Sequence, residues 1–347
     1  MIPKENTALN KETEYLHQTI AMFCCPKCNG DLKAAENSLD CVTCGSSYPI
    51  IDGIPRLFYS NEWDTSQEDV TDKMKSFYEE NPFPSYDDFD SAASLIDKAR
   101  QGLFAKLLDD QIPFGTRVIE CGCGTGQLSN FLSIANRTLI GVDMCINSLK
   151  LARNFKDKNS LDRAHFYQMN LFRPCFKPQS FGLVISNGVL HHTSDPYQAF
   201  VSIANLVSPG GYILIGLYHK YGRLATDVRR VIFNVTKDKF KFLDRHAVDE
   251  HISSAKRKSW FMDQYKNPHE SKHTVTEVLG WLDKVSFKFV YAIPKTVPFV
   301  NIDESERIFK PDKLGNWFDR VIVNTDMIIK GHKEGGFFII IARKPKA

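Results

Sequence analysis

The stretch "VIECGCGTGQLSNFL", Val118 to Leu132, decides the fold. Val118 and Ile119 end an apolar run that predicts a strand, Glu120 follows it, and a helical pattern begins near Gln127. Between strand and helix, three glycines stand on alternate positions. Residues without a side chain allow a tight turn and let a ligand approach the backbone at the start of a helix. The glycines of this predicted binding turn are Gly122, Gly124 and Gly126.

The segments after the glycine turn continue the alternation of strand and helix patterns. "RTLIGVDMCINSLKLARN" predicts a second strand that ends at Asp143, where an acid suits a ribose diol. A third strand ends at Asn170, a fourth at Asn187, and "LVSPGGYILIGLY" predicts a fifth. The glycine turn alone is a weak signal, because several nucleotide-binding folds share it. Together with the ordered strands it predicts an α/β fold with a parallel sheet.

The order of these segments resembles the class I S-adenosylmethionine-dependent methyltransferases. The matching motifs are "ECGCGTG", "GVDM", "MNLF", "SNGVLHH" and "SPGGYILIG", and the likeness covers residues 115–216 and 274–345. A pyridine-nucleotide dehydrogenase would usually show GxGxxG, and it has no role for the last two motifs. The resemblance implies a seven-stranded Rossmann-like sheet whose last strand, "GGFFIIIARKP", is antiparallel.

The same resemblance implies which residues bind S-adenosylmethionine. Glu120 and the glycine turn would hold its methionine part, Asp143 the ribose hydroxyls, and Asn187 the methionine amino group. Asn170 stands where many relatives have aspartate, and its amide oxygen can still accept a hydrogen bond from adenine. The implied cofactor-binding residues are Glu120, Gly122, Gly124, Gly126, Asp143, Met144, Asn170, Leu171 and Asn187.

Four of the nine cysteines form two CxxC pairs near the start of the chain. Two such knuckles joined by a hairpin place four thiolates at the corners of a tetrahedron, as zinc requires. The alternative is a redox-active or free-thiol pair. A closed four-sulfur site leaves no open position for catalysis, so we expect a structural zinc ion. The expected ligands are Cys25, Cys28, Cys41 and Cys44.

The segment around these cysteines resembles the short zinc-ribbon activator family, which partners methyltransferases that act on tRNA, rRNA and release factors. The likeness rests on "CPKCNGDL", "CVTCG" and "YPIIDGIPRL" within residues 22–59. In that family the module binds and stabilises a separate methyltransferase. The resemblance implies that it is fused to one here.

These motifs divide the chain into four parts. Residues 1–21 are expected to be a tail, residues 22–59 a zinc ribbon, and residues 60–114 a linker with lid helices over the cofactor. Residues 115–347 would form the methyltransferase domain, with insertions at 219–273 and 299–333. For the "FYEENPFP" stretch, the alternative to a lid is a linker whose aromatic residues pack on the core.

The helical insertion after the fifth strand is expected to close over the methyl acceptor. Residues 219–273 hold thirteen Lys or Arg against seven Asp or Glu, together with Trp260, Tyr265 and His269. Positive charge there would suit an acceptor that bears carboxylate or phosphate. The alternative is a solvated hairpin without a ligand role. Candidate general bases are His191, His192 and His269.

The sequence favours a small-molecule methyltransferase, with transfer to oxygen favoured and nitrogen or carbon open. One alternative is a tRNA or rRNA methyltransferase, suggested by the zinc ribbon and the basic insertion. Another is a catalytically inert binding or activator protein. A net charge of +3 is too mild to argue for nucleic acid by itself. The longest apolar run is far shorter than a membrane helix needs, so a cytoplasmic protein without a membrane partner is expected.

Overall fold

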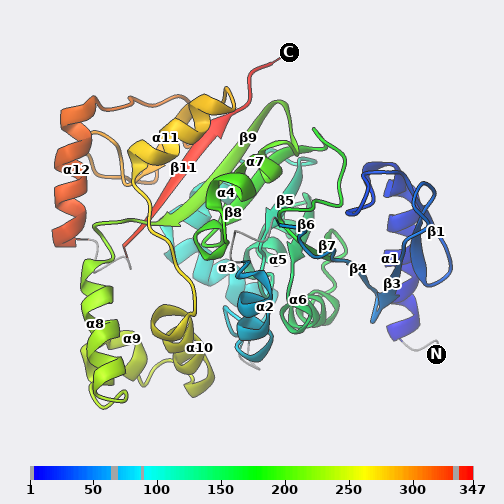
Figure 1. Ribbon diagram of the computed structural model, residues 1–347, viewed down its shortest axis with the longest axis horizontal. Coiled ribbons are helices and arrows are strands. Elements are labelled where there is room, and N and C mark those ends of the chain that lie inside the picture. Colours follow the sequence, from blue (N-terminus) through cyan, green and yellow to red (C-terminus); the bar gives the residue numbers. More distant parts are fainter. Residues whose placement is uncertain (1–3, 64–68, 87–89, 331–335, 347) are drawn as a thin grey trace.

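The computed structural model describes residues 4–63, 69–86, 90–330 and 336–346, with the side chains of all of these except 4–11 and 330. Its centre is an eleven-stranded sheet against which the helices pack (Figure 1). The N-terminal elements lie at one side of the molecule, and the helices of residues 224–235 and 317–330 lie at the other (Figure 1).

Seven strands in the order β7-β6-β5-β8-β9-β11-β10 form the central part of the sheet. Neighbouring strands from β7 to β9 are parallel, whereas β11 is antiparallel to both β9 and β10. The predicted α/β fold with an antiparallel last strand is therefore confirmed. These strands are β5 (Arg117–Cys121), β6 (Thr138–Asp143), β7 (Ala164–Met169), β8 (Phe181–Asn187), β9 (Val207–Tyr218), β10 (Lys288–Ile293) and β11 (Phe337–Arg343).

The expected number of seven strands is wrong for the sheet as a whole, because the cysteine-containing segment adds four more. Its strands follow one another in antiparallel pairs, and the last of them, β4, lies parallel to β7. The register places Arg56 beside Gln168 and Leu57 beside Met169. The added strands are β1 (Leu32–Ala34), β2 (Ser38–Cys41), β3 (Ser47–Ile51) and β4 (Ile54–Leu57).

The two faces of the sheet carry separate apolar cores because side chains alternate along a strand. On β5, Val118 packs with helices α3 (Ala92–Gln101) and α4 (Leu103–Gln111), whereas Ile119 packs with the opposite cluster. That second cluster includes helices α7 (Pro196–Ala204) and α11 (Val275–Lys284). A sheet covered on both sides leaves the ends of its strands as the place for a ligand.

Helix α1 (Lys4–Thr19) occupies the segment that was expected to be a tail. Its Glu12 carboxylate accepts hydrogen bonds from Lys156 Nζ at 2.5 Å and His165 Nδ1 at 2.9 Å. Burial opposes its ionisation, but Lys156 and His165 outweigh that effect and hold the pKa of Glu12 at about 2. The Tyr15 ring stacks on His165 with centroids 3.4 Å apart. These contacts hold α1 against the sheet.

Both expected insertions contain helices in the parts that the structure describes. The second insertion ends at residues 331–333, which lie outside the described residues. No helix in the described ranges is long and apolar enough to cross a membrane. The remaining helices are α2 (Thr71–Glu80), α5 (Gln127–Ser133), α6 (Ile146–Lys158), α8 (Leu224–Val235), α9 (Arg245–Val248), α10 (Ser254–Lys266) and α12 (Trp317–Lys330).

Candidate functional site

The glycine turn joins the end of β5 to the start of α5. At Gly124 the backbone has φ +52°, and an added Cβ would lie 2.2 Å from the Phe83 carbonyl oxygen. Its N–H donates a hydrogen bond to Asp143 Oδ2 at 2.9 Å, which links the ends of β5 and β6. Only glycine fits this position, because the backbone is left-handed and another chain segment lies directly against it.

A cavity of about 580 Å³ opens beside this turn, at the carboxyl ends of the parallel strands. Eight of the nine predicted cofactor-binding residues line it. The exception is Gly126, which faces the protein interior, where an added Cβ would meet Ala152 and Phe166 at less than 3 Å. The eight are Glu120, Gly122, Gly124, Asp143, Met144, Asn170, Leu171 and Asn187.

Of the two acids at the turn, Glu120 is buried and Asp143 is half-buried. Asp143 also accepts from the Cys145 N–H at 2.8 Å, and burial raises its pKa despite its two backbone donors. Glu120 accepts from Ser129 Oγ at 2.5 Å, and burial raises its pKa to about 7. No Lys or Arg of the described ranges lines the cavity. Its wall is therefore suited to a ligand that carries positive charge.

Two asparagines at the strand ends differ in their free hydrogen-bonding capacity. Asn187 Oδ1 is buried without a hydrogen-bond partner in the described part of the chain. A buried acceptor of this kind is costly unless a ligand supplies the donor. The Asn170 amide donates to Tyr59 O and Asn61 Oδ1, and its Oδ1 already accepts from the Phe172 N–H at 3.1 Å. Asn170 thus has one lone pair left for a ligand.

The segment before the first core strand covers the cavity. Tyr78 and Phe83 line it, and Thr125 Oγ1 donates to Pro84 O at 2.6 Å. At the end of α2, the Glu79 carboxylate accepts from the first N–H groups of α6 at 2.7 and 2.8 Å. An acid at a helix N-terminus is stabilising there. The "FYEENPFP" stretch is thereby fixed over the glycine turn, while residues 87–89 lie outside the described residues.

Helix α10 brings the insertion to the cavity through Trp260, Asp263 and Gln264. Tyr265 lies elsewhere: its ring packs on Phe233 and its hydroxyl donates to Asp244. The aromatic residues of the insertion indicated Trp260, but nothing in its sequence indicated Asp263. Whether a charged residue in a mostly polar helix is buried cannot be predicted from the helix sequence alone, because it depends on the segments that pack against it.

The three candidate histidines occupy different positions. His192 lines the cavity, and its Nδ1 lies 2.8 Å from the His269 carbonyl oxygen. His191 lies outside the lining, is fully buried, and its Nδ1 faces the Tyr218 N–H at 3.4 Å. His269 is also outside the lining, with Nε2 3.2 Å from the Thr193 carbonyl oxygen.

The electrostatic environment keeps both buried histidines neutral. Burial lowers the pKa of His192 and lowers that of His191 far below its usual range. Because a carbonyl oxygen can only accept, His192 Nδ1 carries the proton and Nε2 holds a lone pair. Of the three, His192 alone combines a place in the cavity wall with a basic ring nitrogen.

The prediction that basic residues of the insertion line the cavity is wrong for the described residues. Two of the basic residues of the insertion, Arg223 and Arg230, bind the buried Glu270 carboxylate at 2.9 and 2.7 Å. The charged side chain that the insertion does place in the cavity wall is the acid Asp263. The sequence of the insertion lists its charged residues but does not show which of them form ion pairs with one another.

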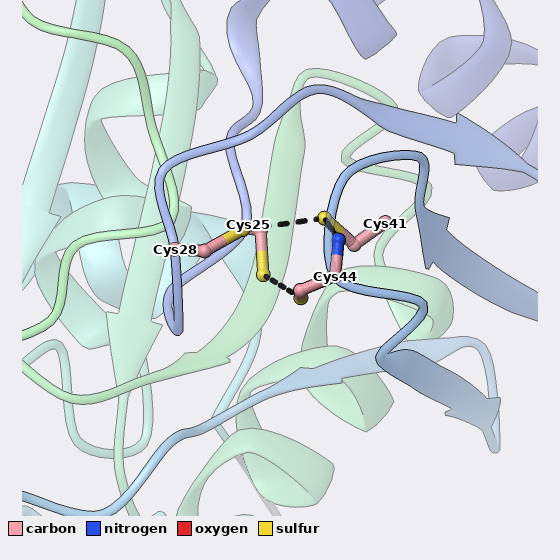
Figure 2. A group of neighbouring side chains, drawn as sticks. All are labelled: Cys25, Cys28, Cys41 and Cys44. Carbon is pink, nitrogen blue, oxygen red and sulfur yellow. Dashed lines mark hydrogen bonds between the residues drawn. The ribbon is translucent and has the colours of Figure 1, made fainter.

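The four expected zinc ligands come together between the two hairpin loops (Figure 2). Their sulfur atoms all lie within 4.8 Å of one another, with 3.7 Å between Cys25 and Cys44 and 3.5 Å between Cys28 and Cys41. A tetrahedral zinc site with Zn–S bonds of about 2.3 Å separates its sulfurs by about 3.8 Å. Cys24 is turned away, with Sγ 3.7 Å from Pro174 O.

Comparison with known proteins gives one family match. Residues 114–278 match a family model described as a methyltransferase domain. An uncharacterized protein of Synechococcus sp. is 31% identical over 110 residues, which are 31% of this chain and 26% of that protein. The ubiquinone biosynthesis O-methyltransferase of Klebsiella pneumoniae is 26% identical over 110 residues, which are 32% of this chain and 46% of that protein. The enzyme of the same name from Photorhabdus laumondii is 23% identical over 177 residues, which are 50% of this chain and 63% of that protein. The chain thus spans less than two thirds of each of these relatives.

Two solved structures are similar at lower identity. A methyltransferase from Methanosarcina mazei, described as S-adenosylmethionine-dependent, is 16% identical, with 70% of this chain and 98% of that chain covered and a TM-score of 0.44. A chain in the complex between the Trm112 methyltransferase activator of Haloferax volcanii and a methyltransferase is 14% identical. The match covers 75% of this chain and 99% of that chain, with a TM-score of 0.42.

Proposed function

We propose that this protein is an S-adenosylmethionine-dependent methyltransferase that acts on a small-molecule acceptor. One observation supports it above the others. A single cavity is lined both by residues near the glycine turn, among them Asp143 and Asn187, and by His192 and Trp260. Its volume of about 580 Å³ is in the range of small-molecule sites. The family match over residues 114–278 agrees with this proposal.

Residues at the ends of β5, β6 and β8 have chemistry that suits the cofactor. Asn187 Oδ1 offers a buried acceptor for the ammonium of the methionine part, and Glu120 adds negative charge nearby. Asp143 would hold the ribose hydroxyls at the end of β6. When bound, the cofactor supplies a methyl group activated on a positively charged sulfur. The chain itself has to orient the acceptor, exclude water and accept a proton.

His192 would accept the proton of the acceptor at Nε2. The His269 carbonyl oxygen fixes the ring tautomer, and burial keeps the ring neutral before the reaction. A base of this kind suits a hydroxyl acceptor, and the O-methyltransferases among the relatives agree with transfer to oxygen. Transfer to nitrogen or carbon uses the same geometry.

We also propose that Cys25, Cys28, Cys41 and Cys44 hold a structural zinc ion. The sulfur spacing agrees with a tetrahedral site, and Thr43 and Cys44 donate backbone N–H groups to Cys41 Sγ at 3.4 Å each. Such donors stabilise a thiolate. In this proposal the module serves as a built-in support for the methyltransferase domain.

The test is transfer of labelled methyl groups to a metabolite extract and to total RNA. We expect label in small molecules, and a loss of at least about a hundredfold in turnover for His192→Ala. His251→Ala removes an exposed histidine of the same insertion and serves as the matched control. Unchanged turnover in His192→Ala would exclude the proposed base. Label in RNA alone, with binding that falls steeply as salt rises, would favour the RNA reading.

A further inference from the structure

The wall of the cavity is partly aromatic, and the buried carboxylate of Asp263 lies in it. Asp263 is 4% exposed, and it is the acid that α10 contributes to the lining. Aromatic rings from four different elements line the same cavity. They belong to Tyr78, Tyr218, Trp260 and Phe337.

Neutral donors hold the Asp263 carboxylate in place. Tyr78 donates to Oδ1 at 2.8 Å, and the Gln264 side-chain amide donates to Oδ2 at 2.8 Å. No Lys or Arg nitrogen within the described ranges forms an ion pair with it. A buried carboxylate whose hydrogen-bond donors are all neutral is favoured by a further donor or by a positive charge from a ligand.

The basic residues behind Asp263 do not reach the cavity. Arg223 donates to Gln264 Oε1 at 2.6 Å and pairs with Glu270, and its side chain is fully buried. Gln264 thus connects the arginine on one side with the carboxylate on the other. Among the described residues, the positive charges of Arg223 and Arg230 face the two carboxylates of Glu270 and Asp263. Of these four charged residues, only Asp263 lies in the cavity wall.

We infer that the acceptor presents an uncharged or cationic hydrogen-bond donor, a hydroxyl or an amine, on an aromatic or apolar frame, and that Asp263 selects it. This inference rests on the proposed methyltransferase function. A carboxylate or phosphate at the same place would face Asp263 without a cation in the wall, and like charges in an enclosed site repel strongly. A flat frame would pack between the rings, whose faces also attract a cation.

Calorimetry with four one-ring probes tests the inference on protein saturated with S-adenosylhomocysteine. The probes are benzylamine, benzyl alcohol, benzoate and phenyl phosphate. We expect the first two to bind at least about tenfold more tightly than the last two, the effect of one hydrogen bond to a charged group. Asp263→Asn should lower the affinity for benzylamine by about tenfold or more and reduce its preference over benzoate. Glu250→Gln removes an exposed charge from the same insertion and should change neither.

Three results would overturn the inference. They are benzoate or phenyl phosphate binding as tightly as benzylamine, none of the four probes binding, and Asp263→Asn leaving the ranking unchanged. If the variant does not fold, the ranking of the probes on the parent protein decides. Binding of S-adenosylhomocysteine is measured first. Its absence would refute the proposed function and the inference with it, whereas a wrong ranking refutes the inference alone.

Discussion

Replacement of Gly124 by alanine tests whether the glycine turn and the segment above it form one unit. The added carbon would lie 2.2 Å from the Phe83 carbonyl oxygen. An ordinary contact between carbon and oxygen is about 3.3 Å or longer. One of the two backbones must therefore move by about 1 Å. The segment of Phe83 yields more readily, because side-chain hydrogen bonds hold it to the turn, whereas the turn itself is held between β5 and α5.

The cost of this movement can be estimated from the contacts that it disturbs. Alanine at φ +52° costs about 1–2 kcal/mol relative to glycine. The displaced segment also strains the hydrogen bonds from Thr125 to Pro84 O at 2.6 Å and from Gln127 to Ser85 O at 3.2 Å, each of which contributes about 1 kcal/mol. We expect Gly124→Ala to lower the free energy of unfolding by about 2–4 kcal/mol.

Urea unfolding measures this loss, and calorimetry with S-adenosylhomocysteine measures its effect on the cavity. Because Phe83 and Pro84 line the cavity, the affinity should fall together with the stability. Gly280→Ala is the matched control. An added Cβ at Gly280, in helix α11, meets no atom within 4 Å, so that variant should be stabilised by up to about 1 kcal/mol. Parent-like stability and affinity in Gly124→Ala would refute the reasoning.

Three further predictions concern the acids and the cysteines. Asp143→Ala should weaken binding of S-adenosylhomocysteine about ten- to a hundredfold, since it removes the proposed ribose ligand together with the acceptor for the Gly124 N–H; equal calorimetric affinity would contradict that role. Cys28→Ser should reduce zinc from about one ion per chain to almost none and lower the melting temperature; elemental analysis that finds no zinc in the parent protein excludes the metal site. Glu120→Gln should remove a pH dependence of stability. Because burial raises the folded-state pKa of Glu120 from 4.5 to about 7, the free energy of unfolding of the parent should fall by up to about 3 kcal/mol as the pH rises from about 4.5 to 7. If urea unfolding shows the same change with pH for the parent and the variant, Glu120 is not the cause.

The parts of the fold that were predicted correctly depend on local patterns. The glycine turn, the strand ending at Asp143 and the strand ending at Asn187 each show their apolar run and their terminal polar residue within a few positions. Parallel strands then bring these ends to one edge of the sheet, so spacing could place most of the residues proposed for the cofactor beside one cavity. The paired cysteines are equally local, because each knuckle is four residues long.

The parts that sequence reasoning missed depend on contacts between distant segments. Nothing near Ile54–Leu57 shows that this strand will pair with β7, and nothing near Glu12 shows that Lys156 and His165 will neutralise it. The acid in the cavity wall was missed for the same reason, whereas His192 and Trp260 were named and line the cavity. Whether Asp263 or a basic neighbour faces the cavity depends on how the insertion folds back, and composition does not contain that information.

The pairing of β4 with β7 has a consequence for the order in which the chain is made. β4 ends at Leu57, whereas β7 begins at Ala164, so the cysteine module leaves the ribosome long before the strand beside which it will lie. Until then β4 keeps one edge unpaired, and an open edge invites other chains. Once β7 has formed, the two are joined in one hydrogen-bonded sheet. Because both belong to one chain, their ratio stays one to one at any dilution, and every copy of the cavity has its own module beside it.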